Sequence, residues 1–338
     1  MTRTAEALVA PGKGILAADE STPTIAKRLA GVGLESTEDL RRTYREILFT
    51  TPEIGEYISG VILFDETIRQ RAADGTPFPE VLQSRGVIPG IKVDRGAKPL
   101  AGFPQEVVTE GLDGLRGRLE EYASMGARFA KWRAVIRIGD GLPTTGCIEA
   151  NAHALARYAA LVQEAGLTPI VEPEVLLDGS HSLERCADVT VTMLRAMYEQ
   201  LGFYRVVLEG SLLKPNMVVP GKDSGIEASV DEIADATIQV MRRAVPAAVP
   251  GIVFLSGGMS PEQATARLDA MNKRGPHPWQ LGFSFARALQ EPVLKTWGGD
   301  DTNRDAAQSA LRHRAELNSA ARSGSYSPDM ELAPSPGA

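Results

Sequence analysis

The sequence is poor in three residue types that often carry chemistry, since its 338 residues include two cysteines, four histidines and nine lysines. Cys147 and Cys186 form neither a disulfide framework nor a metal-binding spacing, so we expect two buried thiols in a reducing compartment. The histidines lie far apart in the sequence, whereas a catalytic zinc site usually needs about two or three imidazoles. We therefore expect no protein-bound metal ion.

Long apolar runs, signal sequences and cofactor-binding motifs are missing as well. No apolar run reaches the length of a membrane span, and the first residues lack a basic flank followed by an apolar core. There is no Walker loop and no dinucleotide-binding fingerprint. The net charge of −7 and the pI near 5.3 argue against nucleic acid or an anionic membrane as a main partner. These absences predict a soluble, cytoplasmic protein without a cofactor.

The scarcity of lysine makes the positions of three lysines informative. The chain has 27 arginines, yet Lys92, Lys131 and Lys214 lie inside or at the end of apolar runs that are typical of buried strands. Arginine cannot lose its proton in such a place, whereas a desolvated lysine can, and a neutral amine attacks carbonyl carbon. The pattern predicts amine chemistry, with pairing to phosphate or carboxylate as the alternative.

Short runs rich in Val, Ile, Leu and Phe alternate with longer amphipathic segments. The predicted strands are Gly14–Ala18, Gly60–Phe64, Pro89–Val93, Phe129–Ile136, Thr168–Val175, Arg205–Leu213, Gly251–Leu255 and Leu281–Phe285. The predicted helices include Thr37–Leu48, Gly114–Met125, Glu149–Ala165, Ser182–Leu201, Val230–Val245 and Pro261–Asn272. Eight strands alternating with helices predict an α/β fold with a parallel sheet closed into a TIM (β/α)8 barrel; a doubly wound open sheet is the alternative.

The predicted barrel is a single catalytic domain that covers residues 1–322. Residues 323–338 are small, polar and interrupted by proline, and they predict a flexible tail outside the barrel.

Polar residues follow nearly every predicted strand at its C-terminal side. They are Asp19-Glu20, Asp65-Glu66, Lys92 and Asp94, Lys131 and Arg133, Glu172 and Glu174, Lys214, Ser256-Gly257-Gly258, and Ser284 with Arg287. In parallel barrels this face carries the active site. Residues two apart on a strand point the same way, so Lys131 and Arg133 should project together. Asp65 and Glu66 also fit an ordinary acidic pair at a helix N-terminus, and we favour that structural interpretation.

An amine that attacks a carbonyl needs a means to lose its proton and partners that move protons. Lys131, if it lies close to Lys214, would favour the neutral amine by like-charge repulsion. Glu172, Glu174 and Asp19 offer carboxyl groups at the same rim. We expect one of them to have a raised pKa and act as an acid, while another stays ionised and takes a proton.

Two separate groups of residues could each bind an anion. The Ser256-Gly257-Gly258 turn offers backbone N–H groups after the seventh strand, and Arg287 follows the eighth, which is the usual phosphate site of such barrels. Lys92 with Lys27-Arg28 could hold a second anion at the opposite end. The residues therefore predict metal-independent Schiff-base chemistry on a phosphorylated carbonyl compound.

Seven of these segments together resemble class I fructose-bisphosphate aldolase, in order and with few gaps from about Val9 to Tyr326. The segment Leu213-Lys214-Pro215-Asn216-Met217 resembles the Schiff-base signature of that family. The others are Gly12–Thr22, Gly60–Phe64, Gly90–Asp94, Ala130–Arg133, Val171–Glu174 and Phe254–Gly258.

This resemblance implies reversible cleavage of fructose 1,6-bisphosphate to dihydroxyacetone phosphate and glyceraldehyde 3-phosphate, in glycolysis and gluconeogenesis. It implies that Lys214 forms the imine, that Glu172 is the general acid/base, and that Asp19 takes the proton of the hydroxyl whose C–C bond breaks. Lys131 would assist with charge, and Glu174 would tune its neighbours. A homotetramer is also implied. The implied substrate- and phosphate-binding residues are Ser256, Gly257, Gly258, Ser284 and Arg287 at one end, and Ser21, Thr24, Lys27, Arg28, Lys92 and Arg133 at the other.

The chain departs from the family pattern at three places. Thr24 stands where the family has Ser, which keeps a hydroxyl. Ala286 stands where animal enzymes have Gly, so the backbone contact there survives unless the position needs φ > 0. The sequence ends at Ala338, whereas animal enzymes end in a Tyr, and Tyr326 matches an internal position instead.

Two other functions fit part of the pattern. A transaldolase-like enzyme, or one that prefers a monophosphate ketose, would share the fold and the imine, but two separated cationic groups suit a bisphosphate. A catalytically silent scaffold would have no need to keep Asp19, Lys131, Glu172 and Lys214 together.

Overall fold

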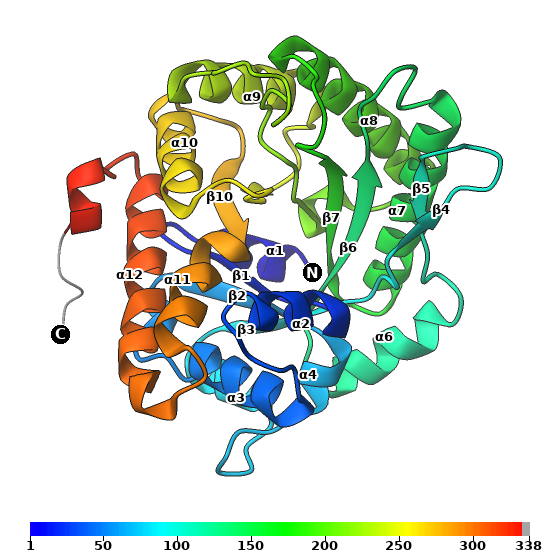
Figure 1. Cartoon of the computed structure of the whole chain (residues 1–338). Helices are drawn as coiled ribbons and strands as arrows, with labels where there is room; N and C mark the ends of the chain where they lie inside the picture. Colours follow the sequence, from blue (N-terminus) through cyan, green and yellow to red (C-terminus); the bar gives the residue numbers. More distant parts are fainter. Residues whose placement is uncertain (333–338) are drawn as a thin grey trace.

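Eight short apolar runs form a closed parallel barrel in the computed structural model, which describes residues 1–332 (Figure 1). The strands lie in the order β1-β10-β9-β8-β7-β6-β3-β2, and β1 pairs with both β2 and β10 to close the sheet. This arrangement confirms the predicted TIM barrel. The strands are β1 (Gly14–Ala18), β2 (Ile58–Leu63), β3 (Ile88–Lys92), β6 (Phe129–Ile136), β7 (Thr168–Val175), β8 (Leu212–Leu213), β9 (Gly251–Phe254) and β10 (Gln280–Phe285). A separate antiparallel hairpin is formed by β4 (Ala97–Pro99) and β5 (Val107–Thr109).

Helices surround the barrel on its outside (Figure 1). They are α2 (Thr22–Ala30), α3 (Glu38–Phe49), α4 (Asp65–Arg69), α5 (Phe78–Ser84), α6 (Leu115–Ser124), α7 (Thr145–Glu164), α8 (Leu183–Phe203), α9 (Val230–Ala244), α10 (Pro261–Lys273), α11 (Arg287–Trp297) and α12 (Arg304–Arg322). The six predicted helices are all present. Thr144 caps α7 by accepting from the backbone N–H of Cys147, so this helix begins before the predicted Glu149. Within residues 1–332, no helix combines the length and the apolar content needed to cross a bilayer.

The predicted strand Arg205–Leu213 is wrong over most of its length. Arg205 has φ of 54°, and residues Leu208–Gly210 form a 3-10 turn, so only Leu212 and Leu213 join the sheet. A short apolar run does not distinguish a strand from a packed loop, and Val206 is buried in the loop before this turn. The correction leaves Lys214 directly after β8.

The apolar core has two layers, one inside the barrel and one between the strands and the helices. The short helix α1 (Thr2–Leu8) closes the N-terminal end of the barrel, where Leu8 and Val9 pack with inward-facing strand residues. Gly60 and Gly251 make room for this contact, because a Cβ at either would lie 2.5 Å from Leu8 or Val9. The open C-terminal end of the barrel is therefore left for function.

The predicted flexible tail begins at residue 323, but its first part is packed on α10 and α12. Tyr326 is 5% exposed; its backbone N–H donates to Asp269, and its hydroxyl donates to Glu331 at 2.8 Å. Glu331 also pairs with Arg314 at 2.5 Å. The packed part of the chain therefore continues to η4 (Pro328–Leu332), beyond the predicted boundary. The rest of the predicted tail, residues 333–338, lies outside the described residues.

Candidate active site

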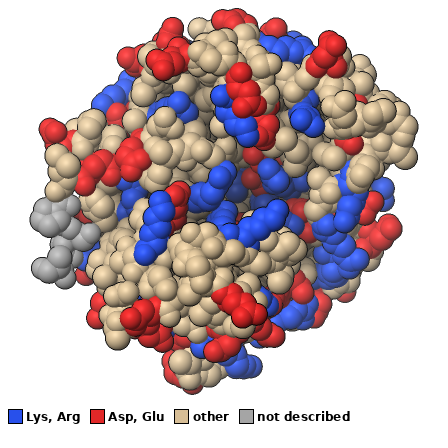
Figure 2. All heavy atoms as spheres, in the orientation of Figure 1, with Lys and Arg blue, Asp and Glu red and all other residues tan. Residues whose placement is uncertain are grey.

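A cavity of about 670 Å³ opens at the C-terminal ends of the barrel strands. Figure 2 shows Lys and Arg side chains gathered around a hollow near the centre of this face, although the whole chain is acidic. Fifteen of the sixteen predicted site residues line the cavity: Asp19, Ser21, Thr24, Lys27, Arg28, Lys92, Lys131, Arg133, Glu172, Glu174, Lys214, Ser256, Gly257, Ser284 and Arg287. Gly258 instead lines an adjoining cavity, which Arg287 also lines.

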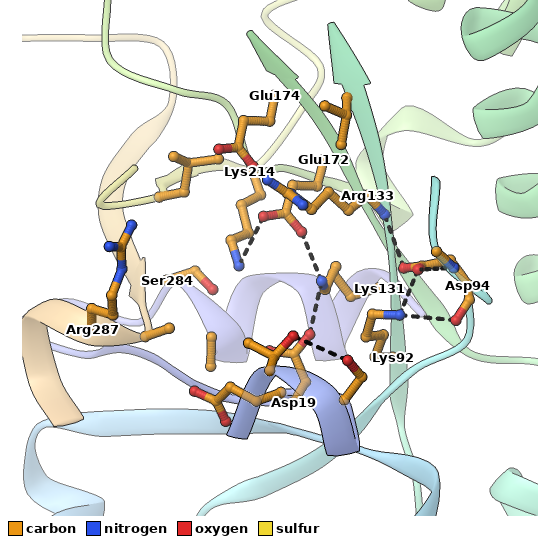
Figure 3. A pocket seen from close by; sticks show the side chains of 18 of the residues that line it. Asp19, Lys92, Asp94, Lys131, Arg133, Glu172, Glu174, Lys214, Ser284 and Arg287 are labelled. Carbon is orange, nitrogen blue, oxygen red and sulfur yellow. Dashed lines mark hydrogen bonds and ion pairs between the residues drawn. The ribbon is translucent and has the colours of Figure 1, made fainter. Parts of the chain in front are cut away.

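The centre of the cavity holds a continuous chain of four charged side chains (Figure 3). Lys214 Nζ lies 3.2 Å from Glu172 Oε1, and Lys131 Nζ lies 2.9 Å from Glu172 Oε2. Lys131 Nζ is also 2.8 Å from Asp19 Oδ2. All four residues are buried, with at most 8% of their surface exposed. Glu172 therefore joins the two ammonium groups, and its charge opposes the repulsion predicted between them.

The ionisation of these groups is set by their mutual contacts more than by burial. Burial alone would raise the pKa of Asp19 and of Glu172, but the charges of Lys131 and Lys214 outweigh it and lower both pKa values. Burial likewise opposes the charge of Lys131, yet Asp19 and Glu172 raise its pKa. A lowered pKa agrees with the expectation that one of the three carboxyl groups stays ionised, but neither Asp19 nor Glu172 is the group with a raised pKa. The sequence does not show that one lysine contacts both.

One side of the cavity suits an anion through β9, β10 and the start of α11. Arg287 begins α11, and no carboxylate in residues 1–332 pairs with it. The Ser284 hydroxyl, from β10, is buried against the cavity and has no hydrogen-bond partner within the described chain. Gly257 has φ of 52°, which turns the loop after β9 toward the cavity. Ala286 has φ of −103°, so this position does not need the positive φ that would favour glycine.

The opposite side of the cavity carries a second group of cations and hydroxyls. Lys92 Nζ contacts Asp94, at 2.5 Å from Oδ1 and 2.9 Å from the carbonyl oxygen. The hydroxyls of Ser21 and Thr24 lie 3.1 Å apart at the start of α2. Arg133 pairs with Glu174 at 2.5 Å. Figure 3 shows Arg287 and Lys92 on opposite sides of the pocket, with Lys214 and Lys131 between them.

Asp94 and Glu20 also contribute to this second side, although the sequence alone indicates no role for either. Asp94 accepts hydrogen bonds from Lys92, from the Gly96 N–H at 3.1 Å and from the Arg133 N–H at 3.2 Å, so it fixes the loop after β3. Its spacing of two residues from Lys92 is the sequence feature that could have indicated this contact. Glu20 pairs with Arg28, which lines the cavity, and nothing in its local sequence indicates that contact.

Asp65 and Glu66 do not line this cavity, as expected from the structural interpretation. They form the first turn of α4, where Asp65 pairs with Arg69 at 2.9 Å and Glu66 with Arg41 at 2.6 Å. Within residues 1–332, no group of three or more His, Cys, Asp or Glu side chains is arranged to hold a metal ion.

Comparison with known proteins gives one consistent family. The family model described as "Glycolytic: Fructose-bisphosphate aldolase class-I" matches residues 1–335. A "Probable fructose-bisphosphate aldolase class 1" from Xanthomonas campestris is 58% identical over 96% of this chain and 98% of its own length. "Fructose-bisphosphate aldolase 4, cytosolic" from Arabidopsis thaliana is 54% identical over 95% of this chain and 82% of its own. The solved fructose-bisphosphate aldolase of Plasmodium falciparum, in complex with TRAP and an inhibitor, matches with a TM-score of 0.95 at 48% identity, covering 96% of this chain and 94% of that one.

Proposed function

The chain belongs to the class I fructose-bisphosphate aldolase family, and we propose on that basis that its reaction proceeds through a Schiff base on Lys214. The family reaction is the reversible cleavage of fructose 1,6-bisphosphate to dihydroxyacetone phosphate and glyceraldehyde 3-phosphate in glycolysis, without a metal ion. The roles below are supported by the contacts of the residues concerned.

In this proposal the substrate is bound by its two phosphates at opposite sides of the cavity. The C1 phosphate lies against Ser284, Gly257 and Arg287, where it also meets the N-terminus of α11. The C6 phosphate lies at the side of Lys92 and Arg28. A ketose held at both ends has its C2 carbonyl near the centre of the cavity, beside Lys214.

Imine formation uses Glu172 as a proton carrier. Ionised Glu172 takes a proton from the ammonium of Lys214, 3.2 Å away, and the neutral amine attacks C2. The carbinolamine then loses its hydroxyl as water, for which Glu172 returns a proton. The lowered pKa keeps this carboxyl ionised, which the first of these steps requires, and the iminium that results is the electron sink for cleavage.

Cleavage of the C3–C4 bond uses Asp19 as the base. Asp19 takes the proton of the C4 hydroxyl, the C3–C4 electron pair moves toward the iminium, and the aldehyde product leaves an enamine on Lys214. Protonation at C3 consumes one proton, which balances the proton that Asp19 took from the C4 hydroxyl. Hydrolysis of the resulting iminium then releases dihydroxyacetone phosphate and the Lys214 amine. Lys131 contacts both Asp19 and Glu172, so its charge favours their ionised forms throughout the cycle. Glu174 holds Arg133 at the rim.

The observation that carries this proposal is the contact of the buried Lys214 ammonium with Glu172. The protein is incubated with dihydroxyacetone phosphate and reduced with borohydride, and the adduct is mapped by mass spectrometry. We expect one labelled lysine, Lys214, and no label in Lys214→Arg. A label on another lysine, or none on the active enzyme, would end the assignment.

We also propose a cytoplasmic location and a homotetramer. The name of the Arabidopsis relative contains the word cytosolic, and the free, buried Cys147 and Cys186 suit a reducing compartment. Phe203 and Val207, near the end of α8, are 70% and 48% exposed, and an exposed apolar surface of this kind suits contact between copies. Light scattering on the purified protein tests the tetramer, and a monomeric mass would contradict it.

A further inference from the structure

Four buried side chains and the partly exposed Arg28 of α2 form a connected group beside the cavity. We call it the Glu20 cluster, and its members are Glu20, Arg28, Tyr44, Arg45 and Gln290. They come from the end of β1, from α2, from α3 and from α11. Two of the five, Glu20 and Arg28, line the cavity. The other three lie deeper, with at most 2% of their surface exposed.

Glu20 is the centre of this cluster, and its two oxygens have different partners. Oε1 accepts from Arg28 Nη1 and, at 2.8 Å, from Gln290 Nε2. Oε2 lies 2.6 Å from Arg45 Nη2. Because one carboxylate is shared by two guanidinium groups, Glu20 holds Arg28 without cancelling the positive charge that this end of the cavity presents.

Gln290 fixes Glu20 to the rest of the site. Its Nε2 donates to the carbonyl of Ala17 in β1 at 2.6 Å as well as to Glu20. Its Oε1 accepts from Tyr44 at 3.2 Å and from Arg45 at 3.4 Å. Gln290 lies one turn after Arg287 on α11, so the same buried contacts connect the helix at the C1 phosphate side with Arg28 at the other.

We propose that Glu20, held by Arg45 and Gln290, is a positioning residue that aims Arg28 at the second phosphate and so sets the preference for a bisphosphate over a monophosphate ketose. This inference rests on the proposed function, since it assigns Arg28 to the C6 phosphate. A free arginine side chain loses much rotamer freedom when it binds an anion, and a partner that orders it beforehand removes that cost. Glu20 acts through Arg28 and does not itself contact the substrate.

The test is a double-mutant cycle read out with two substrates. Glu20→Gln, Arg28→Ala and the double variant are assayed with fructose 1,6-bisphosphate and with fructose 1-phosphate, which lacks the phosphate that Arg28 binds. We expect Glu20→Gln to raise KM for the bisphosphate about tenfold and to leave kcat/KM for the monophosphate within about twofold. In the Arg28→Ala background the same substitution should cause no further loss of bisphosphate preference.

Loss of Glu20 leaves Arg45 buried without its carboxylate, which could impair folding. Glu20→Gln combined with Arg45→Met removes both buried charges, and melting curves show whether either protein is folded. A folded variant that loses activity equally on both substrates, or a Glu20→Gln effect that persists undiminished without Arg28, would overturn the proposal. Borohydride trapping on the wild-type protein tests the Schiff base separately, so failure of one inference does not imply failure of the other.

Discussion

Lys131 on β6 and Asp19 at the end of β1 form a buried ion pair of 2.8 Å between two strands that are not neighbours in the barrel. The same ammonium reaches Glu172 on β7 at 2.9 Å. Removing any one of these charges leaves the others buried with too few partners. The centre of the site is thus stable only as a set, and its charge balance is also what keeps the two carboxyl groups ionised.

Replacing Lys131 with Met should make stability depend on pH in a defined direction. The depressed pKa values of Asp19 and Glu172 contribute stability that is fully present above their unfolded values, about 3.9 and 4.3, and is lost as pH falls through the folded values. Without Lys131, less positive charge opposes the effect of burial, so the pKa values of both carboxyl groups rise. The free-energy cost of burying the two carboxylates is then relieved as they take up protons at lower pH. We expect a loss of about 3–5 kcal/mol at pH 7.5 and a smaller loss at pH 5.

Thermal melting of wild type and Lys131→Met at the two pH values measures this difference. Lys222→Met is the matched control, because Lys222 pairs with Asp178 at the surface, where both side chains are about half exposed. Its effect should be small at both pH values. A Lys131→Met destabilisation of the same size at pH 5 and pH 7.5 would contradict the charge-balance argument.

Much of the site could be predicted from the sequence because a parallel barrel brings the C-terminal ends of its strands together. Lys131 and Lys214 were identified as buried strand lysines, and alternation placed Glu172 with Glu174. The contacts of Arg45 and Gln290 could not be predicted. In an amphipathic helix a buried charge looks like any exposed one, and the partner, Glu20, is far away in sequence. The lowered pKa values of Asp19 and Glu172 could not be predicted for the same reason, because they depend on contacts with Lys131.

The two phosphate-binding sides should respond differently to substitution. Arg287→Ala removes a contact to the C1 phosphate, which fructose 1,6-bisphosphate and fructose 1-phosphate share, so kcat/KM should fall for both. Lys92→Ala should penalise only the bisphosphate. Hydrogen bonds to charged groups contribute about 1.5–3 kcal/mol, which corresponds to roughly ten- to a hundredfold in kcat/KM. Equal losses on both substrates in a well-folded Lys92→Ala protein would show that Lys92 is not the anchor of the second phosphate.

Treatment with excess chelator should leave the cleavage rate unchanged. In the proposed mechanism the iminium on Lys214 accepts the electron pair from the breaking bond, so a Lewis-acidic metal has no step to perform. The measurement compares initial rates before and after dialysis against chelator. Activity that is lost on dialysis and restored by adding zinc would contradict the mechanism.

Arg322 should matter for stability and not for catalysis. This residue of α12 is 8% exposed and donates to backbone carbonyls at the N-terminal end of the barrel, at 3.1 Å to Leu281, 2.6 Å to Ala10 and 3.1 Å to Val9. Arg322→Ala would remove these three hydrogen bonds, at a cost of about 2–4 kcal/mol. The active site lies at the other end of the strands, so kcat should be unchanged well below the melting temperature.

Denaturant unfolding and initial rates, both measured at about 25 °C, separate the two effects of Arg322→Ala. Arg243→Ala is the control, because Arg243 is exposed on α9 and far from the bonds that Arg322 makes. Its unfolding free energy should change by less than about 0.5 kcal/mol. If Arg322→Ala kept wild-type stability, or lost kcat while remaining folded, the N-terminal end of the barrel could not be the purely structural half that its contacts indicate. Stability and chemistry would then not be divided between the two ends of the strands, as parallel barrels generally divide them.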